Sequence, residues 1–496
     1  MSSIETRPVE PAGRADVTAV VWYRNDLRTV DNPALWDACE QHPDGVTAVF
    51  LVAERQWRKH DVGDVRLAYL RETLAQLEIE LKRLKIPLRI EAAPTFADAP
   101  GVMVRVLRET GARALYSNAE YPYNEMRRDA AVARACADSG VRFEQRHGGL
   151  ILPPGSVLTA AGSPYTVFTP FKRRWLETLT PDDYTPLPAP RTTPQRKTNT
   201  QPPAGTARAA ALATLPVLPA DPDWPAGEVA ARQRLTEFLD TRITGYASNR
   251  DFPHQHATSR LSAHLAIGSL SARSALAAAR ERNGGRLNAK PGPFPGIDTW
   301  ISELIWREFY RHVVALFPHV SRGQAFHREF DRLQWRQDPG TLDAWKAGAT
   351  GYPLVDAAMR QLAQTGFMHN RLRMVSAMFL SKHLLIDWRE GERHFMQHLR
   401  DGDFASNNGG WQWSASTGTD AAPYFRIFNP GSQMKKFDPD GSFVRRFVPE
   451  SLAPADGLFA DSDAASAAAN AGPYPAPIVD HRFARQRALD FFKSKP

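Results

Sequence analysis

The sequence has few of the features that mark secreted, membrane-spanning or metal-cluster proteins. Its 496 residues include only two cysteines, Cys39 and Cys136, which are far apart and form no CxxC pair. They provide neither a disulfide framework nor a thiolate zinc site, and they fit a reducing compartment. No apolar run approaches the roughly 18 residues that a membrane span needs. The first residues contain no apolar signal segment, so we expect a cytoplasmic protein with a disordered tail over residues 1–16.

The usual phosphate-binding loops are also absent. No GxGxxG follows the first apolar run, and GxxxxGK followed by Ser or Thr occurs nowhere. Short apolar runs nevertheless alternate with helical patterns, which predicts an α/β domain at 17–150 with a parallel, Rossmann-like sheet. The predicted strands lie at 17–23, 45–53, 86–93, 113–118 and 141–145.

The composition changes after this alternation ends. We assign 151–227 to an interdomain connector that is proline-rich from about residue 180, a density that excludes regular structure. From residue 228 to 496 the apolar spacing is helical almost throughout, which predicts an all-α domain. The net charge of +8 is compatible with an acidic partner such as nucleic acid, although many enzymes are equally basic.

A helix over 299–312 has two different faces. At 100° per residue, three apolar residues share one side, while the opposite arc carries two indoles, a carboxylate and a guanidinium. One interpretation is an aromatic-rich structural helix with a Glu303–Arg307 ion pair, worth about 0.3–0.5 kcal/mol. The other is a binding surface, because these polar groups are costly to bury without partners. The residues of that arc are Trp300, Glu303, Trp306, Arg307 and Tyr310.

Three further stretches contain groups capable of binding or chemistry. The run 258–262, Thr-Ser-Arg-Leu-Ser, precedes a helical pattern and is either an ordinary helix cap or an anion site suited to a phosphate. Asn370, Arg373, Met374 and Ala377 share one face of a predicted helix. Residues 401–430 place Trp411 and Trp413 within turn-forming residues, where tryptophans are poorly placed to build a core.

Two patterns that resemble metal sites lack essential ligands. His394 and His398 are four residues apart, but no glutamate lies between them and no third ligand is evident. The run 401–412 begins like a calcium loop but lacks glycine at its sixth position and glutamate at its twelfth. We therefore expect no metal.

Taken together, these stretches resemble the photolyase/cryptochrome family, most closely the class I bacterial cyclobutane pyrimidine dimer photolyases. The resemblance covers nearly the whole chain. It is carried by WYRNDLRTVDNPAL, YTVFTPFKRRW, TSRLS, ELIWREFYRH, TGYPLVDAAMRQL, MHNRLRM, LLIDWREGE and DGDFASNNGGWQWSASTGTDAAPYFRIFNP.

The resemblance implies that the helical domain binds FAD and damaged DNA. The residues that match FAD-binding positions are Tyr246, Thr258, Ser259, Arg260, Leu261, Ser262, Trp300, Arg307, Phe367, Asn370, Arg373, Asp401, Asp403 and Asn407. Phe367 stands where close relatives often have tryptophan, so it lacks an indole donor. Those that match the pocket for a flipped-out dimer are Glu303, Trp306, Asn370, Met374 and Trp413.

Other roles are implied in the same way. Trp411, Trp388 and Trp335 match an electron-hopping series from flavin to surface, and Arg250, Arg371 and Arg426 match positions that contact DNA phosphates. Asn124 and Glu125 match a methenyltetrahydrofolate antenna site. Ser321 and Arg322 replace the Cys and Lys often found there, which leaves an 8-hydroxy-deazaflavin as the alternative.

The resemblance also implies a repair enzyme rather than a sensor. Asn407 stands where animal cryptochromes tend to have Cys, and Met374 and Trp413 differ from the Gln and Tyr of the single-strand-preferring group. We expect light-driven repair of pyrimidine dimers by electron transfer from reduced FAD, in a monomer without an obligate protein partner. The alternatives are a light-signalling protein, which would be expected to have a long regulatory tail, and a light-independent DNA-binding module, which leaves the aromatic pocket unexplained.

Overall fold

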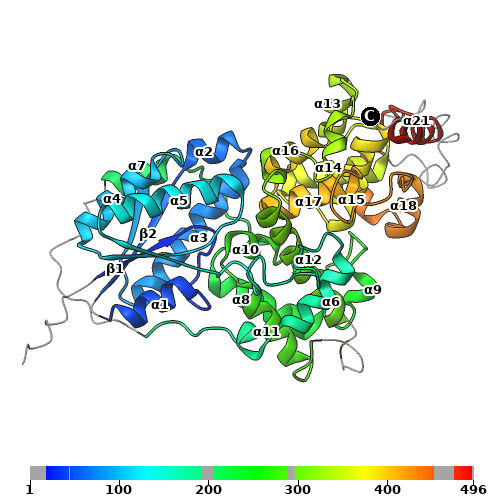
Figure 1. Ribbon diagram of the computed structural model, residues 1–496. Coiled ribbons are helices and arrows are strands. Elements are labelled where there is room, and N and C mark those ends of the chain that lie inside the picture. The colour runs from blue at the N-terminus through cyan, green and yellow to red at the C-terminus, as the bar shows by residue number, and fades with distance from the viewer. Residues whose placement is uncertain are drawn as a thin grey trace, which may run out of the picture.

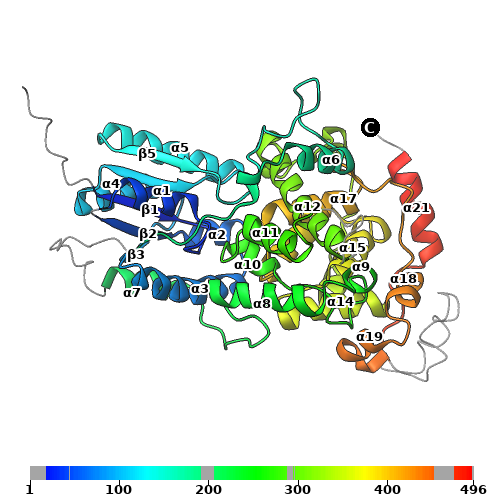
Figure 2. The ribbon, with the colours of Figure 1, turned by 90° about the horizontal axis from the view of Figure 1, so that it is seen from below.

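The computed structural model describes residues 18–43, 45–191, 206–287, 294, 296–451 and 474–493. An α/β part, blue and cyan in Figure 1, lies beside a helical part coloured green through red. Figure 2 shows the C-terminal helix α21 (His481–Lys493) at the edge of the helical part that is farthest from the sheet. The disordered tail expected at 1–16 lies outside the described residues.

Five parallel strands form one sheet in the order β3-β2-β1-β4-β5. Each strand begins and ends within two residues of its predicted bounds, because short apolar runs between helical patterns are a strong local signal. The order reverses beside β1, and in parallel sheets ligands bind at the carboxyl ends next to such a switch point. The strands are β1 (Ala19–Tyr23), β2 (Val46–Val52), β3 (Leu88–Ala92), β4 (Ala114–Asn118) and β5 (Arg142–Arg146).

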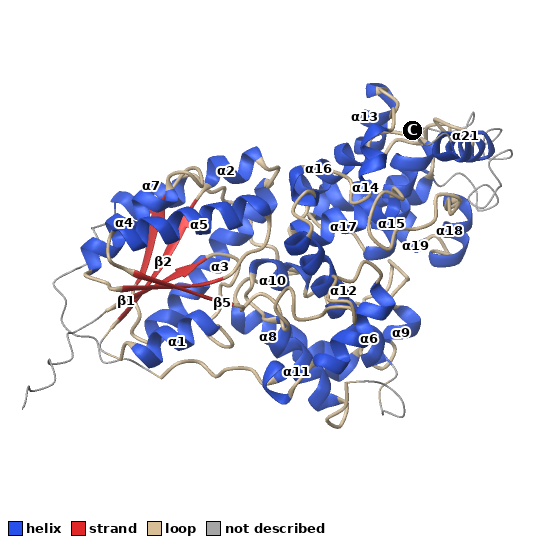
Figure 3. Ribbon diagram, viewed as in Figure 1, coloured by secondary structure: helices blue, strands red, loops and turns tan. Residues whose placement is uncertain are grey.

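Helices cover both faces of this sheet, as Figure 3 shows. Val21 and Tyr23 point into a core formed with α1 and α3, whereas Val20 and Trp22 point into a core formed with α4 and α5. Alternate residues of β1 therefore face opposite layers, as strand geometry requires. The helices are α1 (Pro33–Gln41), α2 (Glu54–Lys59), α3 (Asp64–Arg83), α4 (Ala99–Thr110) and α5 (Tyr123–Asp138).

The loop after β1 joins the two parts of the chain. The buried guanidinium of Arg28 donates to the carbonyls of Asp31, Gly148 and Gly268, and Gly268 belongs to the helical part. The carboxylate of Glu228 accepts from the backbone amide and hydroxyl of Thr29. Buried charged groups need such partners, so the WYRNDLR segment fixes the helical part against the sheet.

The proline-rich connector contains regular structure, contrary to the sequence expectation. Helix α6 (Phe168–Thr178) precedes the proline-rich part, whereas the 3₁₀ helix η1 (Pro181–Tyr184) lies within it, before residues 192–205, which are outside the described range. Helix α7 (Thr206–Ala213) follows and packs against β3, where Ala211 is fully buried. This helix forms because TARAAALA is free of proline and rich in alanine, the strongest helix former.

The remaining helices form the helical part, with α12 packed against α6, α9, α11 and α17. They are α8 (Glu228–Thr241), α9 (Tyr246–Asn249), α10 (Ser262–Ile267), α11 (Ala272–Arg282), α12 (Gly296–Leu316), η2 (Val320–Arg322), η3 (Arg328–Arg332), α13 (Pro339–Ala347), α14 (Pro353–Thr365), α15 (Asn370–Met378), the π-helix η4 (Phe379–His383), α16 (Trp388–His398), α17 (Phe404–Ser414), α18 (Pro430–Phe437), α19 (Ser442–Phe447) and η5 (Pro449–Ser451). None of the described helices has the length and apolar character needed to cross a membrane.

Helix α17 corrects a second expectation, because the Asn-Asn-Gly-Gly stretch is helical and not a turn. A Cβ atom at Gly409 would overlap the ring of Tyr310 on α12, and one at Gly391 on α16 would overlap the indole of Trp411. Glycine therefore allows α17 to approach both neighbours closely. The local turn propensity is overridden by this tertiary packing.

We predict that Gly409→Ala lowers the free energy of unfolding by about 1–3 kcal/mol, the usual cost of overpacking a core. The matched control is Gly101→Ala in α4, where a Cβ atom would meet nothing within 4 Å. That control should stabilise the protein slightly, by about 0.5–1 kcal/mol, because alanine favours a helix over glycine. Urea unfolding of both variants measures the difference. Equal stability of the two variants would contradict the close contact between α17 and Tyr310.

Candidate functional site

Helix α12 presents the two faces that its sequence predicts. Ile301 and Ile305 are fully buried, and Leu304 is nearly so. On the other arc, Trp300 is buried at 3% exposure, while Glu303 and Trp306 are half-buried. The polar arc therefore borders space that protein atoms fill only in part.

Trp306 is covered on one face by an aromatic ring from α6. The rings of Phe168 and Trp306 are stacked, with centroids 3.6 Å apart and an angle of 7° between their planes. Phe309 and Tyr310 pack against the indole at 5.7 and 5.5 Å. These contacts fix the orientation of Trp306, and Phe168 covers one face of the indole, so a flat ligand could stack only on the other face.

The carboxylate of Glu303 pairs with a different arginine from the one that helical spacing indicates. Its Oε1 lies 2.5 Å from Nη1 of Arg250, whereas Arg307 turns away from it. Nearby, Arg371 pairs with Asp251 at 2.7 Å. Two of the three arginines proposed to contact DNA thus already have acidic partners. Among the described residues, the third, Arg426, has no ion pair.

Two arginines and one aspartate meet where α12 crosses the start of α17. Arg307 donates to the carbonyls of Gly149 and Leu265, and burial together with nearby Arg311 lowers its pKa to about 9. Arg311 donates to Asp403 at 2.6 Å. Although burial raises it, the pKa of Asp403 lies well below its usual value because Arg311 and Arg307 stabilise the carboxylate. Arg307 has only the more distant carboxylate of Glu308, at 3.9 Å, as a counter-charge, so the side of the cluster at Arg307 suits an anionic group.

A second ion pair, half-buried at its arginine, joins α15 to the segment just before α17. Asp401 accepts two bonds from Nη2 of Arg373, at 3.0 and 2.8 Å. The ring of Phe367 lies 5.6 Å from the Arg373 guanidinium carbon. The Asn407 amide nitrogen donates to the backbone carbonyl of Glu392, which leaves the Asn407 Oδ1 to accept a bond from a ligand.

The segment 258–262 is not an ordinary helix cap. Helix α10 begins at Ser262, and its cap residue, Leu261, makes no capping bond with its side chain. Arg260 adopts a left-handed backbone with φ of +51°, which is uncommon for a residue other than glycine. Tyr246, at the start of α9, is 6% exposed. The hydroxyls of this turn are not used to cap α10, which favours the interpretation as an anion site.

Helix α17 packs against both α12 and α15, which carry the other expected pocket residues. Met374 is half-buried and Asn370 is exposed at the start of α15. Trp413 is half-buried and its carbonyl accepts from the amide of Ala422. Trp411 points into the core at 2% exposure, so the two tryptophans of α17 face different surroundings.

The three tryptophans of the expected hopping series belong to one core cluster. Trp388 is 1% exposed and Trp335 is 9% exposed. Trp335 is not open to solvent as a surface terminus would be, because Phe491 and Phe492 of α21 pack against it at 5.3 and 6.1 Å. The series is therefore covered at its outer end by the C-terminal helix.

A cavity of about 190 Å³ lies between the α/β part and the helical part. Asn124 and Glu125 line it from the start of α5, opposite Met396 and Phe404. Burial, reinforced by Glu120, raises the pKa of Glu125 to about 7. A smaller cavity of about 70 Å³, lined partly by Trp22 and Phe50, adjoins the carboxyl ends of β1 and β2 and shares Glu125 with the first.

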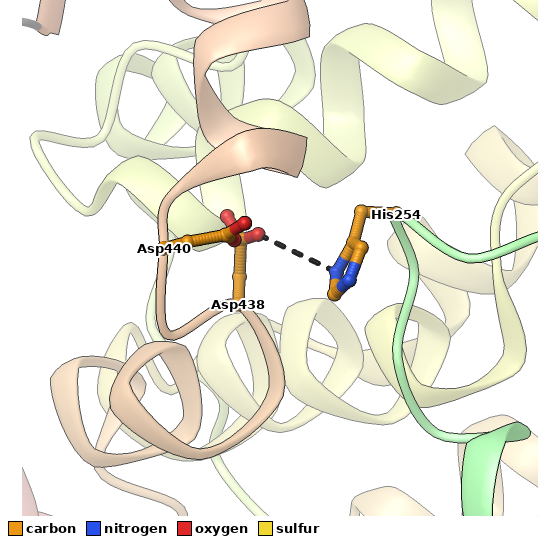
Figure 4. Close-up of side chains that lie close together, drawn as sticks. All are labelled: His254, Asp438 and Asp440. Carbon is orange, nitrogen blue, oxygen red and sulfur yellow. Dashed lines mark ion pairs between the residues drawn. The ribbon is translucent and has the colours of Figure 1, made fainter.

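His254, Asp438 and Asp440 form a group that sequence analysis did not single out (Figure 4). Their ligand-type atoms all lie within 4.8 Å of one another. However, the Asp438 oxygens accept from the amides of Phe443 and Val444 at 2.9 Å each, at the start of α19. The Asp440 carboxylate likewise accepts from the amide and the hydroxyl of Ser442, the first residue of α19. A helix N-terminus carries positive partial charge and opposes a cation, so we interpret the two carboxylates as helix caps.

Sequence reasoning missed Phe168, Arg311 and Lys382. Arg311 lies one helical turn after Arg307, so helical spacing could have indicated it. Phe168 is remote in sequence from Trp306, and no local pattern predicts their stacking. Lys382 lies in an apolar segment that looks like plain interior, and the structure buries it completely.

Comparisons with known proteins agree with this geometry. Residues 300–494 match the family model for the FAD binding domain of DNA photolyase, and residues 19–191 match the model for DNA photolyase. The chain is 40% identical over 492 residues to the deoxyribodipyrimidine photo-lyase of Vibrio cholerae, covering 96% of this chain and 99% of the relative. It is 41% identical over 479 residues to that of Escherichia coli, covering 96% and 98%. A bacterial class III photolyase structure from Agrobacterium tumefaciens is 36% identical, with a TM-score of 0.83 and coverage of 99% and 98%.

We predict that Asp403→Asn lowers the free energy of unfolding at pH 7 by about 1.5–3 kcal/mol, because it leaves Arg311, whose side chain is 15% exposed, without its carboxylate partner. The folded-state pKa of Asp403 is depressed, so its contribution is complete above the unfolded pKa of about 3.9 and is lost as the pH falls through the folded value. Urea unfolding at pH 7 and in acid should therefore show a gap between variant and wild type that narrows in acid. The control Asp298→Asn removes a more exposed pair with Lys172 and should cost under about 1 kcal/mol.

Proposed function

Because the chain belongs to the DNA photolyase family, we propose that it is a carbon–carbon lyase that splits cyclobutane pyrimidine dimers in DNA under near-ultraviolet or blue light. The observation that carries this proposal is the half-buried indole of Trp306, stacked on Phe168 and lying on the same arc of α12 as the carboxylate of Glu303. Photolyases are among the enzymes that take their target bases out of the DNA stack.

The proposed dimer pocket lies between α12, α15 and α17. Trp306 and Trp413 flank the dimer, since an aromatic ring stacks on any pyrimidine face. Glu303 bonds the carbonyl edge of the dimer and stabilises the charge that develops there during ring opening. Asn370 and Met374 complete the lining. Mutual packing of α17 with α12 and with α15 supports this placement.

The chain has an FAD-binding domain, and the residues around α17 fit that cofactor. Arg307 and Arg311 supply excess positive charge, and the Arg307 Nε is buried without a partner among the described residues. The Asn407 Oδ1 is oriented as an acceptor by the carbonyl of Glu392. We propose that Tyr246 and the 258–262 turn hold the diphosphate. When bound and reduced, FAD supplies an electron to the dimer after absorbing light.

We propose that Arg250, Arg371 and Arg426 contact phosphates that flank the lesion. Phosphate contacts fix the position of a protein on DNA without reading sequence. The carboxylate partners of Arg250 and Arg371 hold both guanidinium groups in place before DNA arrives. The net charge of +8 gives the same protein a general attraction for the backbone.

We further propose that an electron passes inward along Trp335, Trp388 and Trp411, starting from Trp335, the most exposed of the three. Indole is among the easiest side chains to oxidise, and all three belong to one continuous core cluster. For the antenna we propose methenyltetrahydrofolate in the cavity between the two parts, with an 8-hydroxy-deazaflavin at the carboxyl edge of the sheet as the alternative. A cytoplasmic monomer with the domain limits 17–150, 151–227 and 228–496 completes the proposal.

The function itself is tested by comparing illuminated and dark samples. Purified protein with chemically reduced FAD should remove thymine dimers from a duplex oligonucleotide only in the light. Glu303→Ala should reduce the repair yield per absorbed photon more than it reduces binding, because its hydrogen bond strengthens as charge develops on the dimer. Equal dimer loss in light and dark would exclude the proposed function.

Substitutions of the two tryptophans of α17 should have different effects. Trp411→Phe keeps an aromatic ring but replaces an easily oxidised indole, so light should no longer bleach the oxidised flavin, while chemically reduced protein still repairs. Trp413→Ala should do the reverse, with bleaching intact and affinity for damaged DNA weakened by about 1–3 kcal/mol, the usual value of one stacking aromatic. Flavin absorbance under light and dimer binding in the dark measure the two effects. Normal bleaching of the oxidised flavin in Trp411→Phe would contradict the proposed role of Trp411 in electron transfer.

A further inference from the structure

Lys382 is a fully buried lysine on the π-helix η4. Lysine is rarely buried completely unless it is paired with an acidic group. No carboxylate forms an ion pair with Lys382 in the described part of the chain; its Nζ instead donates to the carbonyl of Arg426 at 2.9 Å and to that of Pro423 at 3.4 Å. The ammonium group therefore binds the backbone of the loop that ends at Arg426.

This loop returns from the end of α17. At its near end, the amide of Ala422 donates to the carbonyl of Trp413, and at its far end the amide of Arg426 donates to the carbonyl of Pro423. Phe425 is 60% exposed between them. Lys382 is thus the side chain that anchors the exposed end of a loop whose other end is anchored to the proposed dimer pocket.

The position of Lys382 in the chain also links the Arg426 loop to helix α15. Helix η4 continues directly from α15, which carries Asn370, Arg371 and Met374. π-helical turns are rare and are frequently found at functional sites. One buried amine therefore fixes the Arg426 loop relative to the helix that lines the proposed pocket and carries a second DNA-contacting arginine.

An apolar side chain would fill the same space without burying a charge. Burial, together with the charge of Arg426, lowers the pKa of Lys382 to about 7. Its neighbour His383 is held neutral, with burial and His481 lowering the pKa of His383 to about 3, and Arg487 of α21 adds further positive charge there. No carboxylate of α15, α16 or α21 contributes to the shift at Lys382. Packing alone therefore does not account for an amine at this position.

We propose that Lys382 is a positioning residue for DNA binding, whose protonated amine holds the 423–426 loop so that Arg426 meets a phosphate beside the lesion. The inference rests on the proposed function, because it takes Arg426 to contact DNA. Bonds from a charged donor are roughly twice as strong as neutral ones, so loss of the proton loosens the loop.

The direction of the pH effect distinguishes this role from a structural one. Lesion binding should weaken as the pH rises through about 7, where Lys382 loses its proton. The free energy of unfolding should instead increase as the pH rises. The unfolded state retains the lysine proton up to about pH 10, so the unfolded state binds more protons in this window and stability rises with pH. A residue that served packing alone would change both properties in the same direction.

The experiment measures the dark affinity of FAD-loaded, full-length protein for a duplex containing one thymine dimer, from pH 6 to 8.5 at constant ionic strength. We expect affinity to fall about fivefold across this range in the wild type, the difference between a charged and a neutral hydrogen bond. Lys382→Met should bind the lesion weakly at every pH. The ratio of its affinity to that of the wild type should therefore approach one at pH 8.5. Taking this ratio removes contributions from titrating histidines elsewhere.

Three further variants make the result specific. Lys382→Arg keeps a charge at every pH and should bind at pH 8.5 more tightly than the wild type, while Ser381→Ala, its neighbour on η4, should keep the wild-type pH profile. The double variant Arg426→Ala/Lys382→Met should bind DNA no more weakly than Arg426→Ala alone, because Lys382 acts on DNA only through Arg426. A wild-type pH profile in Lys382→Met, an affinity in the wild type that does not change with pH, or additive effects of the two changes would overturn the inference. Absence of light-dependent repair by the wild type would instead overturn the proposed function.

Discussion

Helix α17 lies close to both α12 and α16 only because glycine occupies positions 409 and 391. Any larger residue would overlap Tyr310 on one side or Trp411 on the other. This close packing brings Asp403, at the cap of α17, within bonding distance of Arg311 on α12. Closely packed helices tolerate little added volume. The two glycines therefore allow the approach that brings together the charges suited to an anionic cofactor.

Where α12 crosses the start of α17, the negative charges only partly compensate the two arginines, and this favours the binding of an anion. Asp403 neutralises Arg311, but Arg307 faces only backbone carbonyls and the more distant Glu308. A buried guanidinium without a full counter-charge is costly, as the lowered pKa of Arg307 reflects. The same shortage of negative charge would be relieved by a diphosphate or an anionic ring, so a cost in the protein alone becomes affinity for the cofactor.

The sequence predicted what local periodicity determines. The five strands and the two faces of α12 follow from apolar spacing within a few residues, and the resemblance of long motifs identified the family. It did not predict the Glu303–Arg250 pair, because the i,i+4 spacing to Arg307 is a weaker preference than a contact formed by packing α9 on α12. Turn residues likewise suggested a turn at 407–410, where the opposing rings instead select glycine within a helix. The errors lie where a long-range contact overrides a local preference.

Under the proposed function, the Glu303–Arg250 pair would couple DNA binding to the chemistry of the pocket. In the free protein one oxygen of this carboxylate, Oε1, accepts from the Arg250 guanidinium, so a dimer would have to compete with Arg250 for it. A DNA phosphate carries its own negative charge and competes for the same guanidinium, with bidentate geometry that arginine favours. Under the proposed function, a phosphate that displaced Glu303 from Arg250 would leave this carboxylate free to contact a base stacked on Trp306. Recognition of the backbone would thereby free the group that recognises the lesion, and undamaged DNA, which offers the phosphate but no flipped dimer, would leave Glu303 without a partner.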